Sequence, residues 1–326
     1  MQPVKTLKGA KRQTTVALQD TFSRYWVAVF PSGLGVPPSS AASSRRCFSS
    51  SLRAALYFAF GPLFLSVLPL SAAEPLIHAH AHNDYEHKRP LLDALDHGFC
   101  SVEADIFLVT NQLLVAHNIS QIKPERTIQS LYLDPLRLRV KQNGGRVYPN
   151  GPEFSLLIDL KTEWRATYPV LRLVLIQYSD MLTTSQGDST QTNAIRVIIT
   201  GDRSKEMFAG ETIRYASFDG DLPDLDSSDS PAVVPWVSSS WTRTFRWRGT
   251  GPMPPAEVLK LRNMVDRAHK AGRLLRFWGA PDQEDFWREM SIHGVDLINT
   301  DNLAGLQKFF AGKLMFFQTV PPAPRP

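Results

Sequence analysis

Cysteine is nearly missing from this chain of 326 residues, which has two. Cys47 lies within the first 73 residues, and Cys100 stands alone in the remainder. If the first 73 residues are cleaved off as a leader, no disulfide can form within the remaining chain. A lone cysteine in an apolar strand is usually a small buried hydrophobe. We therefore interpret Cys100 as a core residue.

An excess of one sign of charge is also missing once residues 1–73 are set aside. Those residues hold eight of the 36 Lys and Arg but one of the 31 Asp and Glu. Residues 74–326 thus carry 28 basic and 30 acidic side chains, a net charge of −2, although the whole chain has +5. A body without a basic excess does not favour a broad nucleic-acid-binding surface. The sequence shows no internal repeat of solenoid length either.

The leader itself has two parts. Residues 1–50 mix Ser, Pro, Gly and basic side chains without a sustained period, which predicts disorder. An apolar run over residues 52–70 then follows basic residues and ends in Ser71-Ala72-Ala73. This pattern is typical of a secretory signal, with cleavage after Ala73, and predicts a secreted or periplasmic protein. The alternative is a membrane anchor formed by residues 52–70. Internal Gly and Pro residues favour cleavage.

Residues 74–326 alternate between strand-like and helix-like segments. They number 253, close to the ~250 residues of a typical (β/α)8 barrel. Eight strands are expected, at residues 76–82, 99–109, 154–160, 194–200, 212–218, 232–237, 274–278 and 295–299. An additional extended segment is expected at 112–117. Helical spacing between them indicates a closed parallel sheet. We predict a single α/β (β/α)8 TIM barrel over residues 74–312, followed by a Pro-rich tail at 313–326.

Histidines and carboxylates gather at the predicted strand ends. His82 ends the first strand, Glu103 and Asp105 lie two apart on the second, and His117 ends the extended segment after it. Strand residues two apart point to the same face. Side chains at the carboxyl ends of barrel strands converge on one mouth. Carboxylates there suit a hard divalent cation, and imidazoles suit proton transfer at a phosphate ester.

The third strand adds a carboxylate and a cation to this mouth, Asp159 and Lys161. The common explanation of such a pair is an ion pair at the surface. Taken together with Glu103 and Asp105, however, the carboxylates would repel one another unless a cation lay between them.

The pattern His82, Glu103-x-Asp105 and His117 resembles the signature of the glycerophosphodiester phosphodiesterases, within the phospholipase-C-like phosphodiesterase superfamily. Asp159-x-Lys161 is similar to the sphingomyelinase-D branch. The segments His82–Tyr85, Ser101–Asp105, Leu113–His117, Arg276–Trp278 and Gly294–Asp301 resemble most closely the group of the altered inheritance of mitochondria protein number six. The Arg-Gly that follows the first His of glycerophosphodiesterases is replaced here by Asn83-Asp84.

This resemblance implies a metal-dependent phosphoric diester hydrolase acting on a glycerophosphodiester or phospholipid headgroup. Glu103, Asp105 and Asp159 would bind Mg²⁺ or Ca²⁺, and His82 and His117 would be the acid and base. Asn83 and Lys161 would supply phosphate contacts by analogy. Trp278, at the end of the seventh expected strand, suits either contact with the alcohol part of the substrate or core packing. Two alternatives stay open: a lyase that releases a cyclic phosphate, and a silent barrel that binds a ligand. Peripheral membrane contact is compatible with the pattern, and the oligomeric state is open.

Other residues compete for roles at this mouth. His78 and His80 precede His82 at strand spacing, but Asn-Asp-Tyr follows His82, which favours His82 as the catalyst. Asp301 at the end of the eighth strand suits either the site or an N-cap of the last helix. Four aromatic residues in or after the sixth expected strand fit packing within the barrel better than contact with a lipid chain: Trp236, Trp241, Phe245 and Trp247.

Overall fold

The computed structural model describes residues 73–319 of the chain. The predicted leader up to residue 72, including the membrane-anchor alternative at 52–70, lies outside the described residues, as do residues 320–326 of the predicted tail. Among the described residues, no helix combines the length and the apolar character that a membrane crossing requires.

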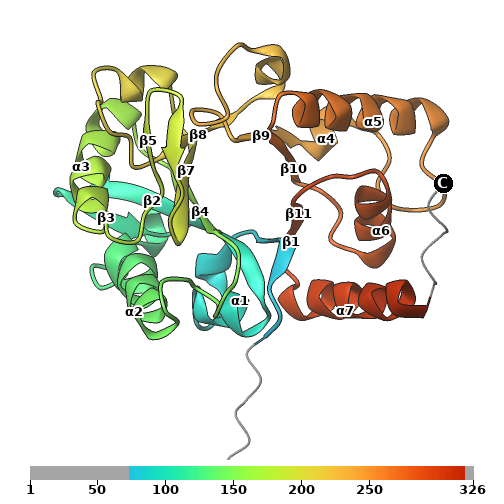
Figure 1. The fold of residues 1–326 in the computed structure, drawn as a ribbon, viewed down its shortest axis with the longest axis horizontal. Coiled ribbons are helices and arrows are strands. Elements are labelled where there is room, and N and C mark those ends of the chain that lie inside the picture. Colours follow the sequence, from blue (N-terminus) through green and yellow to red (C-terminus); the bar gives the residue numbers. More distant parts are fainter. Residues whose placement is uncertain (1–72, 320–326) are drawn as a thin grey trace, which may run out of the picture. The chain divides into compact units, whose positions relative to one another are not determined.

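Eight parallel strands form the centre of the described region (Figure 1). In spatial order they are β1 (Leu76–Ala81), β2 (Phe99–Val109), β4 (Phe154–Leu160), β7 (Ile195–Gly201), β8 (Ser217–Gly220), β9 (Trp236–Ser240), β10 (Leu274–Trp278) and β11 (Ile298–Thr300). β11 pairs with β1, and a parallel bridge between Arg276 and Leu297 joins β10 to β11. The sheet therefore closes, which confirms the (β/α)8 barrel.

Helices surround the sheet, as Figure 1 shows. They are α1 (Leu92–Asp96), α2 (Asp134–Gln142), α3 (Trp164–Ile176), α4 (Trp241–Thr244), α5 (Pro255–Lys270), α6 (Glu284–Ile292) and α7 (Leu303–Thr319). The ends of α5 follow from its sequence. It begins at Pro255, because the first residues of a helix have no intrahelical partner for their N–H groups, and it ends before Gly272, which has φ 68°. Its buried residues Leu261, Met264, Val265 and Ala268 recur at helical spacing.

Short helical turns and a hairpin fill the connections. They are η1 (Asp84–Glu86), η2 (Ile119–Gln121), the π-helical turn η3 (Gln129–Leu133), η4 (Lys205–Phe208) and η5 (Leu222–Asp226). β3 (Gln112–Val115) runs antiparallel to the end of β2. β5 (Thr184–Gln186) and β6 (Ser189–Gln191) form a separate two-stranded sheet.

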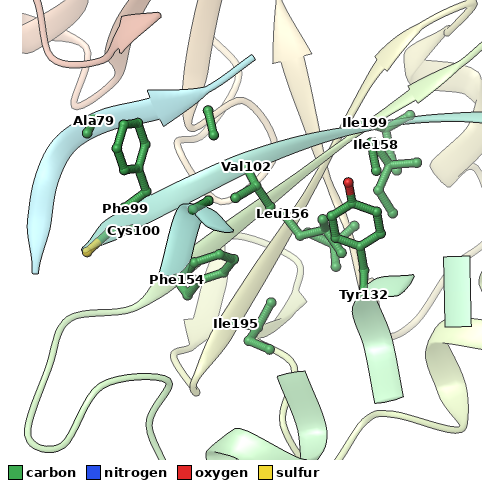
Figure 2. Packing of buried hydrophobic residues seen from close by; sticks show 14 of the residues in the cluster. Ala79, Phe99, Cys100, Val102, Tyr132, Phe154, Leu156, Ile158, Ile195 and Ile199 are labelled. Carbon is green, nitrogen blue, oxygen red and sulfur yellow. The ribbon is translucent and has the colours of Figure 1, made fainter. Parts of the chain in front are cut away.

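The main core lies between the strands and the helices (Figure 2). Phe99, Leu156 and Ile158 are buried there with at most 1% exposure, and Cys100 is buried, as predicted for a small hydrophobe. Truncating such a buried leucine or isoleucine to alanine typically costs about 2–5 kcal/mol, because the lost contacts leave a cavity.

A smaller apolar cluster fills the barrel interior. Leu157, Ile198, Trp236 and Leu297 come from different strands or their approaches and are at most 4% exposed. Layers of this kind are characteristic of a packed barrel, which has no central pore. The cluster forms a floor beneath the carboxyl ends of the strands.

Four expected boundaries are wrong. The strand predicted at 295–299 lies at Ile298–Thr300. The strand predicted at 212–218 lies at Ser217–Gly220, because residues before it instead pair with the hairpin, where Arg214 bridges Ser185. The strand predicted at 232–237 is displaced to Trp236–Ser240. The tail predicted from residue 313 begins later, since α7 continues to Thr319.

Candidate active site

Three carboxylates meet at the carboxyl end of the barrel. Glu103 and Asp105 lie on the same face of β2, and Asp105 stands in register with Asp159 of β4. Each offers a ligand oxygen within 4.8 Å of the others. The parallel pairing of two buried apolar strands thus brings together residues that are 54 positions apart, as the sequence predicts for this mouth.

The environment of Asp105 suits a bound cation. Burial, and then the charges of Glu103 and Asp159, raise the pKa of Asp105 to about 6. Its Oδ1 is buried without a hydrogen-bond partner. A buried oxygen without a partner is costly, and oxygen donors are what Mg²⁺ and Ca²⁺ take as ligands. The donor set of Glu103, Asp105 and Asp159 therefore fits a divalent cation.

Lys161 lies beside the same group. Its Nζ is 2.9 Å from Oδ2 of Asp105 and 2.9 Å from Oδ2 of Asp159. Burial lowers the pKa of Lys161, but the two carboxylates overcome this and the net shift is upward. The ammonium group of Lys161 therefore offsets part of the repulsion between Asp105 and Asp159.

Glu103 is held by an arginine from the opposite side of the barrel. Nη1 of Arg276, on β10, donates to Oε2 of Glu103 at 2.8 Å, and Nε of Arg276 donates to Ser238 at 3.1 Å. Burial alone would raise the pKa of Glu103, but the charge of Arg276 holds it well below its usual range. Glu103 is therefore ionised despite being buried.

His80 belongs to this buried group, one layer below His82. Its Nδ1 lies 2.7 Å from Oγ of Ser101, and its Nε2 lies 2.5 Å from Nη1 of Arg276. Complete burial, followed by the charge of Arg276, lowers the pKa of His80 to about 4. His80 is accordingly neutral at pH 7, so its Nε2 accepts from Arg276 and its 3.3 Å approach to Glu103 is no ion pair.

His117 stands on the other side of the carboxylates. Its Nδ1 lies 3.4 Å from Oδ2 of Asp105 and 2.9 Å from the hydroxyl of Tyr85. The side chain is 46% exposed, so the ring reaches solvent while one nitrogen is anchored. Tyr85 comes from η1 and also contacts Asp105 at 2.6 Å.

His82 lies just beyond the end of β1. Its Nδ1 is 2.8 Å from Oδ1 of Asp301, and the amide of Asn83 lies 3.0 Å from the same nitrogen. Burial lowers the pKa of His82, but Asp301 and Glu103 more than offset this and raise it. Asn302, and not Asp301, accepts from the first turn of α7, at Gly305 N. The side chain of Asp301 therefore contacts His82 and does not cap α7.

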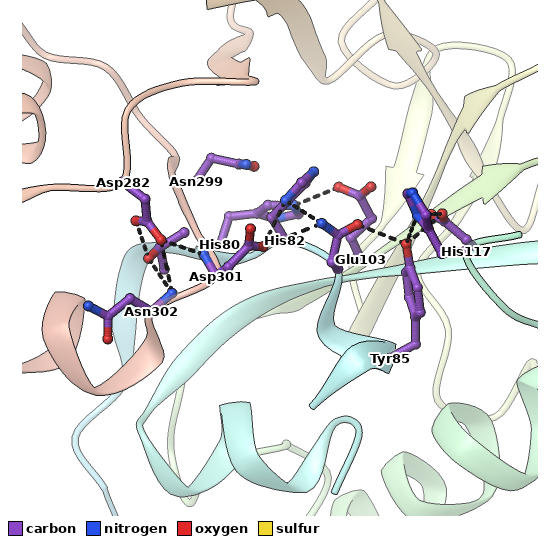
Figure 3. A network of polar contacts seen from close by, with 12 residues as sticks. His80, His82, Tyr85, Glu103, His117, Asp282, Asn299, Asp301 and Asn302 are labelled. Atoms are coloured by element: carbon purple, nitrogen blue, oxygen red, sulfur yellow. Dashed lines mark hydrogen bonds and ion pairs between the residues drawn. The ribbon is translucent and has the colours of Figure 1, made fainter. Parts of the chain in front are cut away.

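Figure 3 shows these labelled side chains in one continuous row, from Asp301 through His82 to Tyr85 and His117, with Glu103 beside them. Trp278 is not part of the row: it ends β10 and is 38% exposed, with the guanidinium of Arg243 5.8 Å from its ring centroid. The other aromatic candidates are buried and packed together, as their packing interpretation predicts: Trp236, Trp241, Phe245 and Trp247.

Two residues of this mouth had no role assigned from the sequence, Arg276 and Tyr85. Arg276 is a charged residue inside the apolar run Leu274–Trp278, and that position alone could have indicated an inward-facing partner for a buried acid. Tyr85 follows His82 within three residues, but its burial among polar atoms depends on the loop conformation. Asn83 sets that conformation at φ 48°, in the left-handed region that Asn tolerates.

The sequence is similar to those of known proteins. Residues 71–219 match the AIM6-like phosphodiesterase domain. Altered inheritance of mitochondria protein 6 from Eremothecium gossypii is 30% identical over 276 residues, which cover 72% of this chain and 69% of that protein. The chain belongs to the altered inheritance of mitochondria protein 6 family. The homolog from Arthroderma benhamiae is 28% identical over 264 residues, covering 72% of this chain and 84% of its own length. The family resemblance drawn from the motifs is thereby confirmed, and the chain carries a phosphodiesterase-like domain.

Solved structures give more distant similarities. A glycerophosphodiester phosphodiesterase from Parabacteroides distasonis superposes with a TM-score of 0.45 and 15% identity, covering 74% of this chain and all of that one. The enzyme of the same name from Agrobacterium tumefaciens gives a TM-score of 0.44 and 16% identity, covering 73% of this chain and all of that one.

Proposed function

We propose that this chain is a metal-dependent phosphoric diester hydrolase that acts on a glycerophosphodiester or a phospholipid headgroup. One observation carries the proposal: the carboxylates Glu103, Asp105 and Asp159 lie together, and a buried oxygen of Asp105 has no partner. The phosphodiesterase-like domain of the family supports the reaction class.

In this proposal Glu103, Asp105 and Asp159 hold Mg²⁺ or Ca²⁺. The bound ion would stabilise the charge that develops on the phosphoryl oxygens, worth several kcal/mol in such sites. Lys161 is close enough to Asp105 and Asp159 to contact a non-bridging oxygen of the same phosphate. Asn83 would add a neutral hydrogen-bond donor, and Trp278, at the rim, would contact the alcohol part of the substrate.

The two histidines divide the proton transfers. One of His82 and His117 accepts the proton of the attacking oxygen, and the other donates a proton to the leaving oxygen. Both rings are anchored through Nδ1, His82 at Asp301 and His117 at Tyr85. General acid–base catalysis of this kind contributes on the order of 10²–10⁴-fold to the rate.

The test is an activity screen with matched variants. The purified full chain is assayed against glycerophosphocholine, phosphatidylinositol, sphingomyelin and bis(p-nitrophenyl) phosphate, with Mg²⁺, with Ca²⁺ and with a chelator. We expect cation-dependent hydrolysis that falls by about 10²–10⁴-fold in His82→Ala and in His117→Ala. His97→Ala is the control, because His97 bonds a carbonyl of α1 away from the site.

Retention of near-wild-type activity in either histidine variant would refute these roles. Phosphorus NMR of the products distinguishes hydrolysis from release of a cyclic phosphate. The absence of turnover on all four compounds, with no binding of either cation, would instead support the silent-barrel alternative.

Export is a separate part of the proposal, supported by the apolar run and the small residues before Glu74. N-terminal sequencing of the protein from its natural source tests it. A mature chain that begins at Glu74 is expected, and a chain that retains residues 52–70 in a membrane fraction would contradict it.

A further inference from the structure

The hydroxyl of Tyr85 lies within hydrogen-bond distance of three polar atoms. Its oxygen is 2.6 Å from Oδ2 of Asp105, 2.8 Å from Oδ1 of Asn83 and 2.9 Å from Nδ1 of His117. A phenol has one hydrogen to donate, and its oxygen accepts through lone pairs. The three contacts can therefore be satisfied only if Tyr85 donates once and accepts from the others.

The single hydrogen must go to Asp105. An ionised carboxylate has no hydrogen of its own, so any other choice would press two oxygen lone pairs together at 2.6 Å. Hydrogen bonds to charged acceptors are also the stronger ones. Both other neighbours of Tyr85, the imidazole of His117 and the amide of Asn83, are able to donate.

The direction of this bond determines the tautomer of His117. Its Nδ1 faces the oxygen of Tyr85 at 2.9 Å and Oδ2 of Asp105 at 3.4 Å. Both atoms act as acceptors toward the ring, so Nδ1 must carry a hydrogen. The lone pair of a neutral His117 is then on Nε2, the nitrogen that no described contact occupies.

The other histidine, His82, also carries its hydrogen on Nδ1. Nδ1 of His82 lies 2.8 Å from a carboxylate oxygen of Asp301, so it too carries a hydrogen. The amide of Asn83 lies between the two histidines, 3.0 Å from Nδ1 of His82 and 2.8 Å from Tyr85. Rotating that amide by half a turn about its last torsion directs its NH₂ to Tyr85 and its oxygen to His82. Tyr85, Nδ1 of His82 and Nδ1 of His117 then each direct a hydrogen at an acceptor, and the 3.5 Å contact of the Asn83 amide nitrogen with Oδ1 of Asp301 is given up.

We propose that Tyr85 is a positioning residue that fixes His117 with its hydrogen on Nδ1, so that Nε2 of His117 is the nitrogen that exchanges protons with substrate. The part about substrate rests on the proposed function; the tautomer does not. Tyr85 is also bound to Asp105, so one hydroxyl relates the orientation of the imidazole to that of the carboxylate group. The near-parallel rings of Tyr85 and His117, 17° apart, are compatible with this arrangement.

The tautomer is measured directly by long-range ¹H–¹⁵N correlation NMR of the full chain labelled at histidine nitrogens. At about pH 8.5, well above the usual imidazole pKa, neutral rings report which nitrogen carries the hydrogen. We expect His117, assigned with a His117→Gln variant, to show the Nδ1–H pattern. In Tyr85→Phe, we expect a shift toward the Nε2–H pattern that is common in unconstrained histidine.

Tyr178→Phe is the matched control, because Tyr178 also donates to a carboxylate, Asp134 at 2.6 Å, away from the mouth. It should leave the His117 signals unchanged. An Nε2–H pattern in the wild type, or an unchanged pattern in Tyr85→Phe, overturns the inference. Tyr85→Phe should also lower kcat roughly 10–100-fold with little change in KM, as loss of an orienting partner does. If the wild type has no activity but the tautomer shift is seen, the proposed function fails and the positioning role stands.

Discussion

Arg276 and Glu103 form an ion pair inside the barrel, at 3% and 6% side-chain exposure. Removing two charges from water costs several kcal/mol for each ion, and a buried pair regains this only with further hydrogen bonds. Here Arg276 also donates to Ser238, and Glu103 has one oxygen left for the mouth. The pair is therefore better explained by the orientation of Glu103 than by a contribution to stability.

We predict that Arg276→Met lowers the free energy of unfolding by about 3–5 kcal/mol, because it leaves Glu103 buried without its partner. Urea denaturation in the presence of a chelator measures this without contributions from metal binding. The double variant with Glu103→Gln should regain part of the loss, since no unpaired charge is left. A single variant as stable as the wild type would contradict the expectation.

Asp84 is a second buried acid, and it holds the loop that carries Asn83 and Tyr85. Its Oδ2 accepts from the backbone N–H of Leu91 at 2.5 Å and from Tyr132 at 2.8 Å. Burial raises the pKa of Asp84 from 3.8 to about 7. The folded chain thus retains a proton that the unfolded chain releases between these two pH values, so this group costs stability as pH rises through that window.

The corresponding prediction is a difference between pH profiles. The free energy of unfolding of Asp84→Asn, minus that of the wild type, should rise between about pH 4 and pH 7, because the amide does not titrate. Chemical denaturation across this range measures the difference. Asp105 adds a similar slope to both proteins and cancels. A difference that is independent of pH would show that Asp84 is ionised in the folded chain throughout.

At the scale of elements, the end of β7 limits the space available to β4. Gly201 has φ 82°, and a Cβ there would lie 2.1 Å from Oδ1 of Asp159 and 2.5 Å from the carbonyl oxygen of Leu160. Both the backbone conformation and the close approach require glycine. The position of Asp159 in the carboxylate group therefore depends on a neighbouring strand that contributes no side chain.

Gly201→Ala should accordingly displace Asp159. We expect Mg²⁺ affinity, measured by isothermal titration calorimetry, to fall roughly 10–100-fold, the usual effect of disturbing the surroundings of a metal ligand. Gly210→Ala is the control, because Gly210 has a similar φ of 80° with nothing within 4 Å of its Cβ. Equal affinities in the two variants would separate Gly201 from the metal site.

The elements also show what the sequence could predict. β2, β4 and β10 were predicted with their observed bounds, because alternation in β2 and the mostly apolar segments of β4 and β10 identify strands. The predicted segments at 212–218 and 232–237 end directly before Asp219 and Ser238, buried polar residues that lie inside β8 and β9. In these two strands the apolar segment stops before the strand does, so the apolar pattern alone gives the wrong bounds.

The site follows the same division. Glu103, Asp105 and Asp159 were predictable together because neighbouring strands and the period of two place them on one face. The contact of Arg276 with Glu103 spans 173 residues and crosses the barrel, so no local pattern indicates it. The hydrogen bonds of Tyr85 depend on a loop whose shape is set by Asn83 and Asp84.

For the whole molecule, a ligand that binds only the folded state raises its stability. If the carboxylate group binds Mg²⁺ or Ca²⁺, a concentration of about 100 times Kd should stabilise the fold by roughly 2.7 kcal/mol. Thermal unfolding with and without the cation measures the shift in Tm. Asp105→Asn should reduce the shift strongly, whereas Asp180→Asn, at an exposed ion pair with Arg137, should not. Equal shifts in both variants would place cation binding elsewhere.

The floor of Leu157, Ile198, Trp236 and Leu297 has a kinetic consequence. In the proposed reaction, substrate and products would enter and leave through the same opening at the carboxyl ends of the strands, because this cluster fills the barrel below the carboxylates. The alcohol and the phosphomonoester that leave would pass through the opening by which the next substrate molecule enters. Accumulated product should therefore compete with substrate for this opening. Product inhibition should slow turnover during a reaction even while substrate is in excess.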